Sequence, residues 1–192
     1  MKKVLVLAAA MFASINMFAQ GTVNFGNNNA TAVINSVTGA KIVAGNSFTA
    51  ELWYAPDTGS VPAAAAMAPI AGARTGISPI AGLITGGTKM TPNTTAPGVT
   101  AYFQIRIWET AYGADWATAQ TTVLNGRNAI AGSSDIIKVT TGNPGAIPPG
   151  TPGSLVTAGL KSFNVIQIVP EPSVVGLGLL GAGALMFLRR RK

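Results

Sequence analysis

The chain has 192 residues, of which 13 are Lys or Arg, 6 are Asp or Glu, 23 are Gly and 12 are Pro. This length predicts one domain at most. Because histidine and cysteine are both absent, the chain cannot form Ser-His-Asp or Cys-His nucleophile systems, haem ligation by His, thiol-ligated clusters or almost any structural zinc site. We therefore expect no metal and no other cofactor.

The positive charge lies at the two ends of the chain. Lys2 and Lys3 stand at the start and four basic residues stand at the end, whereas residues 20–170 carry seven bases and five acids. A protein that binds nucleic acid needs Lys and Arg gathered on its folded surface. We therefore expect no nucleic-acid partner.

The first 19 residues have the order of a secretory signal. Lys2 and Lys3 are followed by apolar residues 4–13 and then by a short segment that ends at Ala19, which is the order of n-region, h-region and cleavage region. Ten apolar residues are too few to span a bilayer. Residues 1–19 are therefore predicted to be a signal peptide that engages the export translocon and is removed by signal peptidase, with a buried amphipathic helix as the alternative.

The end of the chain predicts a transmembrane helix. Residues 173–188 carry no charge, and sixteen residues reach about 24 Å as a helix, enough to span with local thinning of the bilayer. The chain then ends in four basic residues, Arg189, Arg190, Arg191 and Lys192. Because such residues stay on the cytoplasmic side, residues 20–169 are predicted to form an exported domain on the outer side of the inner membrane.

Between this domain and the helix stands the tripeptide Pro170, Glu171, Pro172. A residue that precedes proline favours an extended backbone, which is the form in which a processing enzyme binds a substrate strand. A Pro-Glu-Pro tripeptide, a Gly-rich apolar helix and a terminal Arg cluster, in this order, resemble the PEP-CTERM sorting signal of bacteria. The resemblance covers residues 170–192.

The resemblance implies an exosortase as partner, a membrane-embedded enzyme that recognises the tail, removes it and commits the rest to the cell surface or extracellular matrix. It implies no activity for the domain, because family members differ widely in what precedes the tail. We expect a non-enzymatic surface or matrix protein, with exopolysaccharide or other matrix components as candidate partners. An ordinary single-pass membrane anchor is the alternative for the tail.

The exported domain shows the period of two that is typical of strands. Apolar and polar residues alternate in residues 47–54 and again in residues 99–108, and both segments are predicted to be half-buried strands. Several short strands separated by turn residues predict an all-β, β-sandwich-like domain. Further strands are expected at residues 22–25, 32–37, 136–140 and 163–169.

Two stretches rich in Ala, Pro and Gly interrupt this pattern. Residues 55–98 and 142–153 are predicted to be long surface loops between strands. Residues 115–120 are predicted to form a single helical turn.

Two kinds of residue in the domain could carry chemistry. Glu51 and Glu109 lie on or beside the two best strands and could meet across a sheet as the carboxylate pair of a hydrolase. Alternation predicts that Trp53 and Trp108 could face outward, and Trp53, Trp108 and Trp116 could then grip a sugar ring, which would make the domain a carbohydrate-binding or adhesive module. The interpretation we favour for these tryptophans is that they cover the second face of a sheet beneath the loops, because Trp is usually largely buried.

Overall fold

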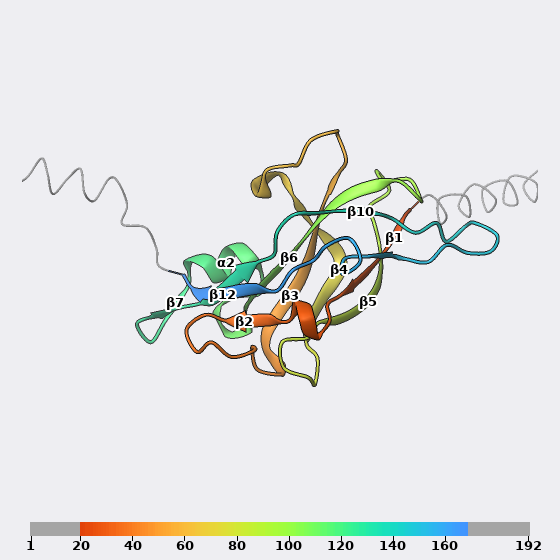
Figure 1. Cartoon of the computed structure of the whole chain (residues 1–192). Coiled ribbons are helices and arrows are strands. Elements are labelled where there is room, and N and C mark those ends of the chain that lie inside the picture. Colours follow the sequence, from red (N-terminus) through yellow and green to blue (C-terminus); the bar gives the residue numbers. More distant parts are fainter. Residues whose placement is uncertain (1–19, 169–192) are drawn as a thin grey trace, which may run out of the picture.

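The computed structural model describes residues 20–168, which are mostly β-sheet with a single short α-helix in that part of the chain (Figure 1). The prediction of an all-β domain is confirmed at this level. The predicted signal peptide at 1–19 and the sorting tail at 170–192, with its helix at 173–188, lie outside the described residues. Within residues 20–168, no helix is long and apolar enough to cross a membrane.

A seven-stranded sheet forms the larger part of the domain. Its central strands, β3 (Gly45–Pro56) and β6 (Thr100–Glu109), pair antiparallel from Phe48 opposite Glu109 to Pro56 opposite Ala101. Beyond β3 lies β4 (Ala68–Ile77). On its other side β6 pairs with both β9 (Ile130–Ser133) and β10 (Ile137–Thr140). From β9 the sheet continues to β12 (Phe163–Gln167) and then to β2 (Val33–Asn35).

A smaller sheet of three strands has the order β11, β1, β5, with β1 (Thr22–Gly26) in its centre. Strand β1 pairs antiparallel with β5 (Thr85–Met90) and parallel with β11 (Gly153–Ser154). A separate two-stranded hairpin joins β7 (Val123–Leu124) to β8 (Arg127–Asn128). Its turn residues Asn125 and Gly126 have φ of 52° and 73°, which favours this Asn-Gly pair.

The two sheets contribute to one hydrophobic core. On β6 the odd-numbered residues face this core, and on β3 the even-numbered residues do, as the alternation predicts. They pack with Val23 and Phe25 of the smaller sheet, both 0% exposed. The core residues of the two central strands are Ala101, Phe103, Ile105 and Ile107 on β6, and Phe48, Ala50, Leu52 and Tyr54 on β3.

The opposite face of β6 is also covered, so the prediction of a half-buried strand is wrong for β6. All its residues from Ala101 to Trp108 are buried. The cover comes from short helical segments that lie between strands: η3 (Ala64–Ala66), η4 (Thr110–Tyr112) and α2 (Trp116–Thr121). A further 3-10 helix, η2 (Asn29–Thr31), follows β1.

The predicted long loop at residues 55–98 is wrong, because this stretch contains β4 and β5. The pairing of β4 with β3 is irregular, with shifts of register between Gly45 and Thr49 and between Glu51 and Trp53. The buried residues of β4 are therefore Ile70, Ala73 and Ile77 rather than every second one, and the period that identifies a strand is lost. Strand β9 was not predicted either, whereas the helical turn at 115–120 corresponds to α2.

Candidate functional site

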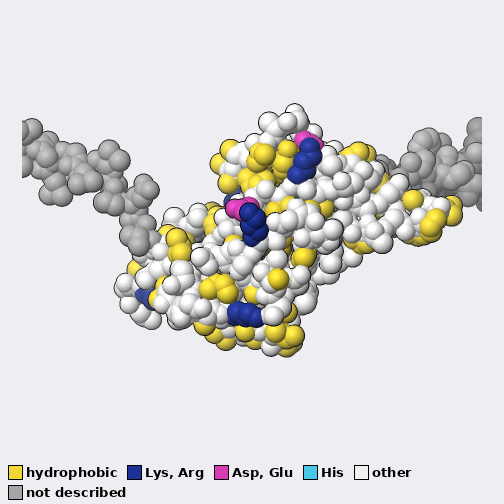
Figure 2. All heavy atoms as spheres, in the orientation of Figure 1, with side chains coloured by type: hydrophobic (Ala, Val, Ile, Leu, Met, Phe, Trp, Pro, Cys, Tyr) yellow, Lys and Arg dark blue, Asp and Glu magenta, His cyan; other side chains and the backbone are white. Residues whose placement is uncertain are grey.

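Half of the charged side chains of the domain are paired with one another. Figure 2 shows them as a few separate spots on a surface of uncharged atoms, two of them a basic side chain beside an acidic one. Salt bridges join Arg74 to Glu51 at 2.7 Å, Arg127 to Glu109 at 2.8 Å and Lys138 to Asp57 at 2.6 Å. Three of the five carboxylates of the domain are thus occupied by a cation.

The structure does not bring Glu51 and Glu109 together. Glu51 lies opposite Arg106 on β6, three positions before Glu109, so the alternation of the strand directs the two carboxylates to opposite faces of the sheet. The carboxylate of Glu51 accepts hydrogen bonds from Arg74 and from Trp53 Nε1, and that of Glu109 accepts from Arg127 and the backbone of Ile130. This placement does not provide a hydrolase pair.

The three tryptophans occupy different environments. Trp108 is 0% exposed and donates through Nε1 to the carbonyl of Gly113, so the idea that it faces outward is wrong. It packs beneath η4 and α2 with Tyr112 and Ala119. Trp53 is partly buried, with one face on the Arg106 guanidinium. Trp116 is partly buried and lines two surface hollows, so of the three it is the one placed to contact a ligand.

Trp116 is held in place by the start of α2 and by Trp108. The carboxylate of Asp115 caps the helix by accepting a hydrogen bond of 2.8 Å from the backbone N–H of Thr118, and this bond lowers the pKa of Asp115. The rings of Trp116 and Trp108 meet edge to face, with centroids 6.2 Å apart, an arrangement that aromatic pairs favour. The buried tryptophan therefore orients the partly exposed one.

Arg106 lies at the base of the first hollow. Its Nε donates to Gln104 Oε1 at 2.9 Å, its Nη2 donates to the carbonyl of Ala64 at 2.6 Å, and its guanidinium stands 3.6 Å from the ring centroid of Trp53. The residue is 7% exposed, and burial lowers the pKa of its guanidinium, an effect that the nearby charge of Glu51 opposes.

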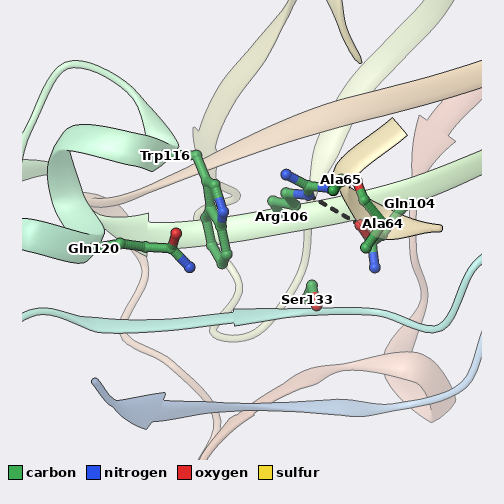
Figure 3. A pocket seen from close by; sticks show the side chains of 7 residues that line it. All are labelled: Ala64, Ala65, Gln104, Arg106, Trp116, Gln120 and Ser133. Atoms are coloured by element: carbon green, nitrogen blue, oxygen red, sulfur yellow. Dashed lines mark hydrogen bonds between the residues drawn. The ribbon is translucent and has the colours of Figure 1, made fainter. Parts of the chain in front are cut away.

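The first hollow has a volume of about 290 Å³. Figure 3 shows Trp116 and Gln120 of α2 on one side of it, Ala64 and Ala65 of η3 on the other, and Ser133 of β9 below. Its lining residues are Ala64, Ala65, Gln104, Arg106, Trp116, Gln120 and Ser133.

A second hollow of about 340 Å³ adjoins the first and shares Trp116, Gln120 and Ser133 with it. It runs over β9 to β12, where the described chain ends at Ile168. We call the two hollows together the Trp116 groove. The residues that the second hollow adds are Ala131, Gly132, Asn164, Ile166 and Ile168.

Sequence reasoning singled out Trp116 in this groove but missed the polar residues around it. In the sequence, Arg106 stands between two isoleucines of a predicted strand, and alternation alone assigns its side chain to solvent. The predicted sorting residues lie outside the described part of the chain: Pro170, Glu171, Pro172, Arg189, Arg190, Arg191 and Lys192.

Within residues 20–168, no three acidic side chains gather in the way that a metal site requires. Comparisons with protein-family models, with curated proteins and with solved structures found no match to this chain.

Proposed function

We propose that this chain is an exported, non-enzymatic protein of the cell surface or extracellular matrix. In this proposal a signal peptide at residues 1–19 delivers a β-sandwich-like domain, and an exosortase processes the PEP-CTERM tail at residues 170–192. The observation that carries the proposal is the ordered combination of Pro-Glu-Pro, uncharged helix and basic end in the last 23 residues.

The tripeptide follows the folded domain almost directly in the sequence. The last described residue, Ile168, is partly buried and donates its backbone N–H to the carbonyl of Ala129 at 2.8 Å. One residue, Val169, separates it from Pro170. A processing enzyme that binds the tripeptide would therefore work close to the β12 end of the domain, which lies opposite the end where β1 begins (Figure 1).

The charge arrangement supports a non-enzymatic role over a hydrolase. The two carboxylates that could have formed a catalytic pair lie on opposite faces of the sheet, and each is bound by an arginine. Trp53 Nε1 also donates to Glu51, and the backbone N–H of Ile130 also donates to Glu109, so both carboxylates are already engaged within the domain.

The tail is tested by following its processing in a host that contains its exosortase and in one that lacks it. Glu171→Gln and Pro172→Ala should accumulate as uncut precursor in the membrane fraction, while wild type yields the shorter mature band. Asp135→Asn is the matched control, because it converts an exposed carboxylate of the domain to an amide and should be processed normally. If all four proteins remain full length and membrane-bound in both hosts, the plain single-pass anchor is correct.

A carbohydrate-binding role is the second candidate, and the Trp116 groove favours it. A partly exposed indole beside free polar side chains is a common arrangement for holding a sugar ring. A screen of the protein against a panel of glycans tests this role independently of the tail.

A further inference from the structure

We propose that the Trp116 groove binds an acidic polysaccharide, with a sugar ring against Trp116 and a carboxylate of the ligand at Arg106. The inference deepens the second candidate function above and rests on the proposed export only for the setting in which such a polymer is met.

Arg106 brings a buried positive charge to the groove. It is nine-tenths buried, yet no carboxylate of residues 20–168 lies within 4 Å of its guanidinium. Its hydrogen-bond acceptors, Gln104 Oε1 and the carbonyl of Ala64, are both neutral. The nearby charge of Glu51 offsets part of the cost of burying this guanidinium, but no direct ion pair is formed, and a bound anion would lower the remaining cost.

The acid that lies opposite Arg106, Glu51, is already bound by other side chains. Glu51 lies opposite Arg106 in the pairing of β3 with β6, but one of its carboxylate oxygens accepts two hydrogen bonds from Arg74 and the other accepts from Trp53. The positive charge at the base of the hollow is therefore left for a ligand. Among anions, a carboxylate matches the planar guanidinium well.

The groove is also lined by polar and aromatic side chains. Trp116 presents an indole to the hollow, and such a ring packs well against the C–H face of a sugar. In the described part of the chain, the side chains of Gln120 and Ser133 make no hydrogen bond, and both are exposed. Their amide and hydroxyl groups can therefore bond to sugar hydroxyls.

The two hollows together make the Trp116 groove longer than either hollow alone. Each hollow, at about 290 and 340 Å³, is at the small end of ligand sites, but they share Trp116, Gln120 and Ser133 and continue one another. Asn164 and Ile166, the latter 55% exposed, extend the lining over β12. A chain of sugars fits this shape better than a single one.

The arrangement disfavours a polyphosphate ligand. Nucleic acids are held by several Lys and Arg residues along the backbone, whereas Arg106 is the one cation among the residues that line the two hollows. A single buried guanidinium beside an indole suits a polymer with one carboxylate per sugar and otherwise neutral groups.

The test is affinity electrophoresis of the full-length protein in detergent, through gels that contain polygalacturonate, carboxyl-reduced polygalacturonate or dextran. The first two polymers share a backbone and differ in charge. We expect polygalacturonate to retard the protein, the reduced polymer to do so at least tenfold more weakly, and dextran to have no effect. Added salt should weaken the binding.

Variants assign the binding to the groove. Trp116→Ala should reduce the affinity roughly tenfold or more, as removal of a central aromatic contact does, and Gln120→Ala should reduce it less. Arg106→Gln should abolish the preference for the charged polymer. Arg127→Gln is the control, because it removes a cation outside the groove whose side chain is 46% exposed, and it should bind as wild type does.

Three results would overturn the proposal: no retardation by polygalacturonate, equal retardation by its reduced form, or equal loss of binding in Arg127→Gln and Trp116→Ala. Because Arg106 is buried, its variant is also checked for folding by circular dichroism; if it is unfolded, Trp116→Ala and the pair of polymers still decide. The assay measures binding to the groove and not removal of the tail, so its outcome is separate from that of the processing experiment.

Discussion

On one face of β6, aliphatic and aromatic side chains pack into a core shared with the smaller sheet, whereas the other face of the same strand carries Gln104, Arg106 and Trp108. Both faces are buried. The first is covered by β-sheet and needs no polar partners. The second is covered by short helical segments, and it donates hydrogen bonds to the backbone carbonyls of Ala64 in η3 and of Gly113 just after η4.

This difference explains why the candidate site lies on the second face. A face packed by a sheet is closed along its length, since neighbouring strands leave few voids in a core. Part of the cover of the second face comes from η3 and α2, which approach β6 from different parts of the chain and leave the first hollow between them. Polar groups at such a gap remain accessible to a ligand.

The largest expected effect concerns whether the first face suffices for folding. All residues of its core lie between Val23 and Val165, so a fragment of residues 20–169 should fold without either end of the chain. We expect a strand-rich circular dichroism spectrum and a cooperative thermal transition that a chelator leaves unchanged. A disordered spectrum would contradict the assignment of this core as sufficient.

Removing a large side chain from the first face should have the next largest effect. Phe103 is 0% exposed and packs against Tyr54 with ring centroids 5.8 Å apart. Phe103→Ala should lower the free energy of unfolding by about 3–5 kcal/mol, measured by urea denaturation. Ile147→Ala is the control, because Ile147 is 100% exposed, and should unfold as wild type does. A loss below about 1 kcal/mol for Phe103→Ala would mean that this face is loosely packed.

A change of charge on the second face should have an intermediate effect. Glu51→Gln keeps the shape and an acceptor for Trp53 but removes the negative charge near Arg74 and Arg106. We expect a loss of about 1–3 kcal/mol in the free energy of unfolding, moderated because the Arg74 side chain is 43% exposed.

The matched control for this change is Glu109→Gln. Glu109 is also bound by a half-exposed arginine, but its side chain is more exposed than that of Glu51, 15% against 6%. Its loss should stay below about 1 kcal/mol. Equal losses for the two variants would show that the second face around Arg106 has no special dependence on Glu51.

The first face could be predicted from sequence and the second could not. Alternation in β3 and β6 identified the residues of the core correctly, because a strand places every second side chain on the same face. The cover over Arg106 comes from Ala64, 42 residues before it, and from Trp116 in α2, and only the fold brings them together. Trp116 was recognisable as a candidate by its chemistry, whereas the burial of Arg106 was not.

A repeated tetrapeptide shows the same limit at β4. The sequence Pro-Ile-Ala-Gly occurs at residues 69–72 within β4 and at residues 79–82 in the turn that follows it. Ile70 is 5% exposed and Ile80 is 60% exposed. Four identical residues thus take different structures, because pairing with β3 decides the conformation of the first copy.

The smallest expected effect is a dependence of the free energy of unfolding on pH, which arises at Asp57 beside the start of β6. Asp57, just after β3, accepts hydrogen bonds from Thr100 of β6 at 2.6 Å and from the backbone of Gly59 at 2.9 Å, and it pairs with Lys138 of β10. The bond from Lys138, followed by those from Thr100 and Gly59, lowers the pKa of Asp57 from 3.8 to about 2.

Because the pKa of Asp57 is lower in the folded state than in the unfolded chain, the folded state binds fewer protons. The contribution of ionised Asp57 to stability is therefore present above about pH 4 and is lost as the pH falls towards 2.

Asp57→Asn lacks this contribution at every pH. The difference in free energy of unfolding between wild type and Asp57→Asn should therefore be largest at pH 5 and shrink towards pH 2, and it should be smaller in high salt because the Lys138 side chain is 49% exposed. Urea denaturation at several pH values measures it. A difference that stays constant from pH 5 to pH 2 would mean that the pairing with Lys138 and Thr100 does not stabilise the ionised form, and that the edge of β6 is held by its backbone pairing with β3 and β10 alone.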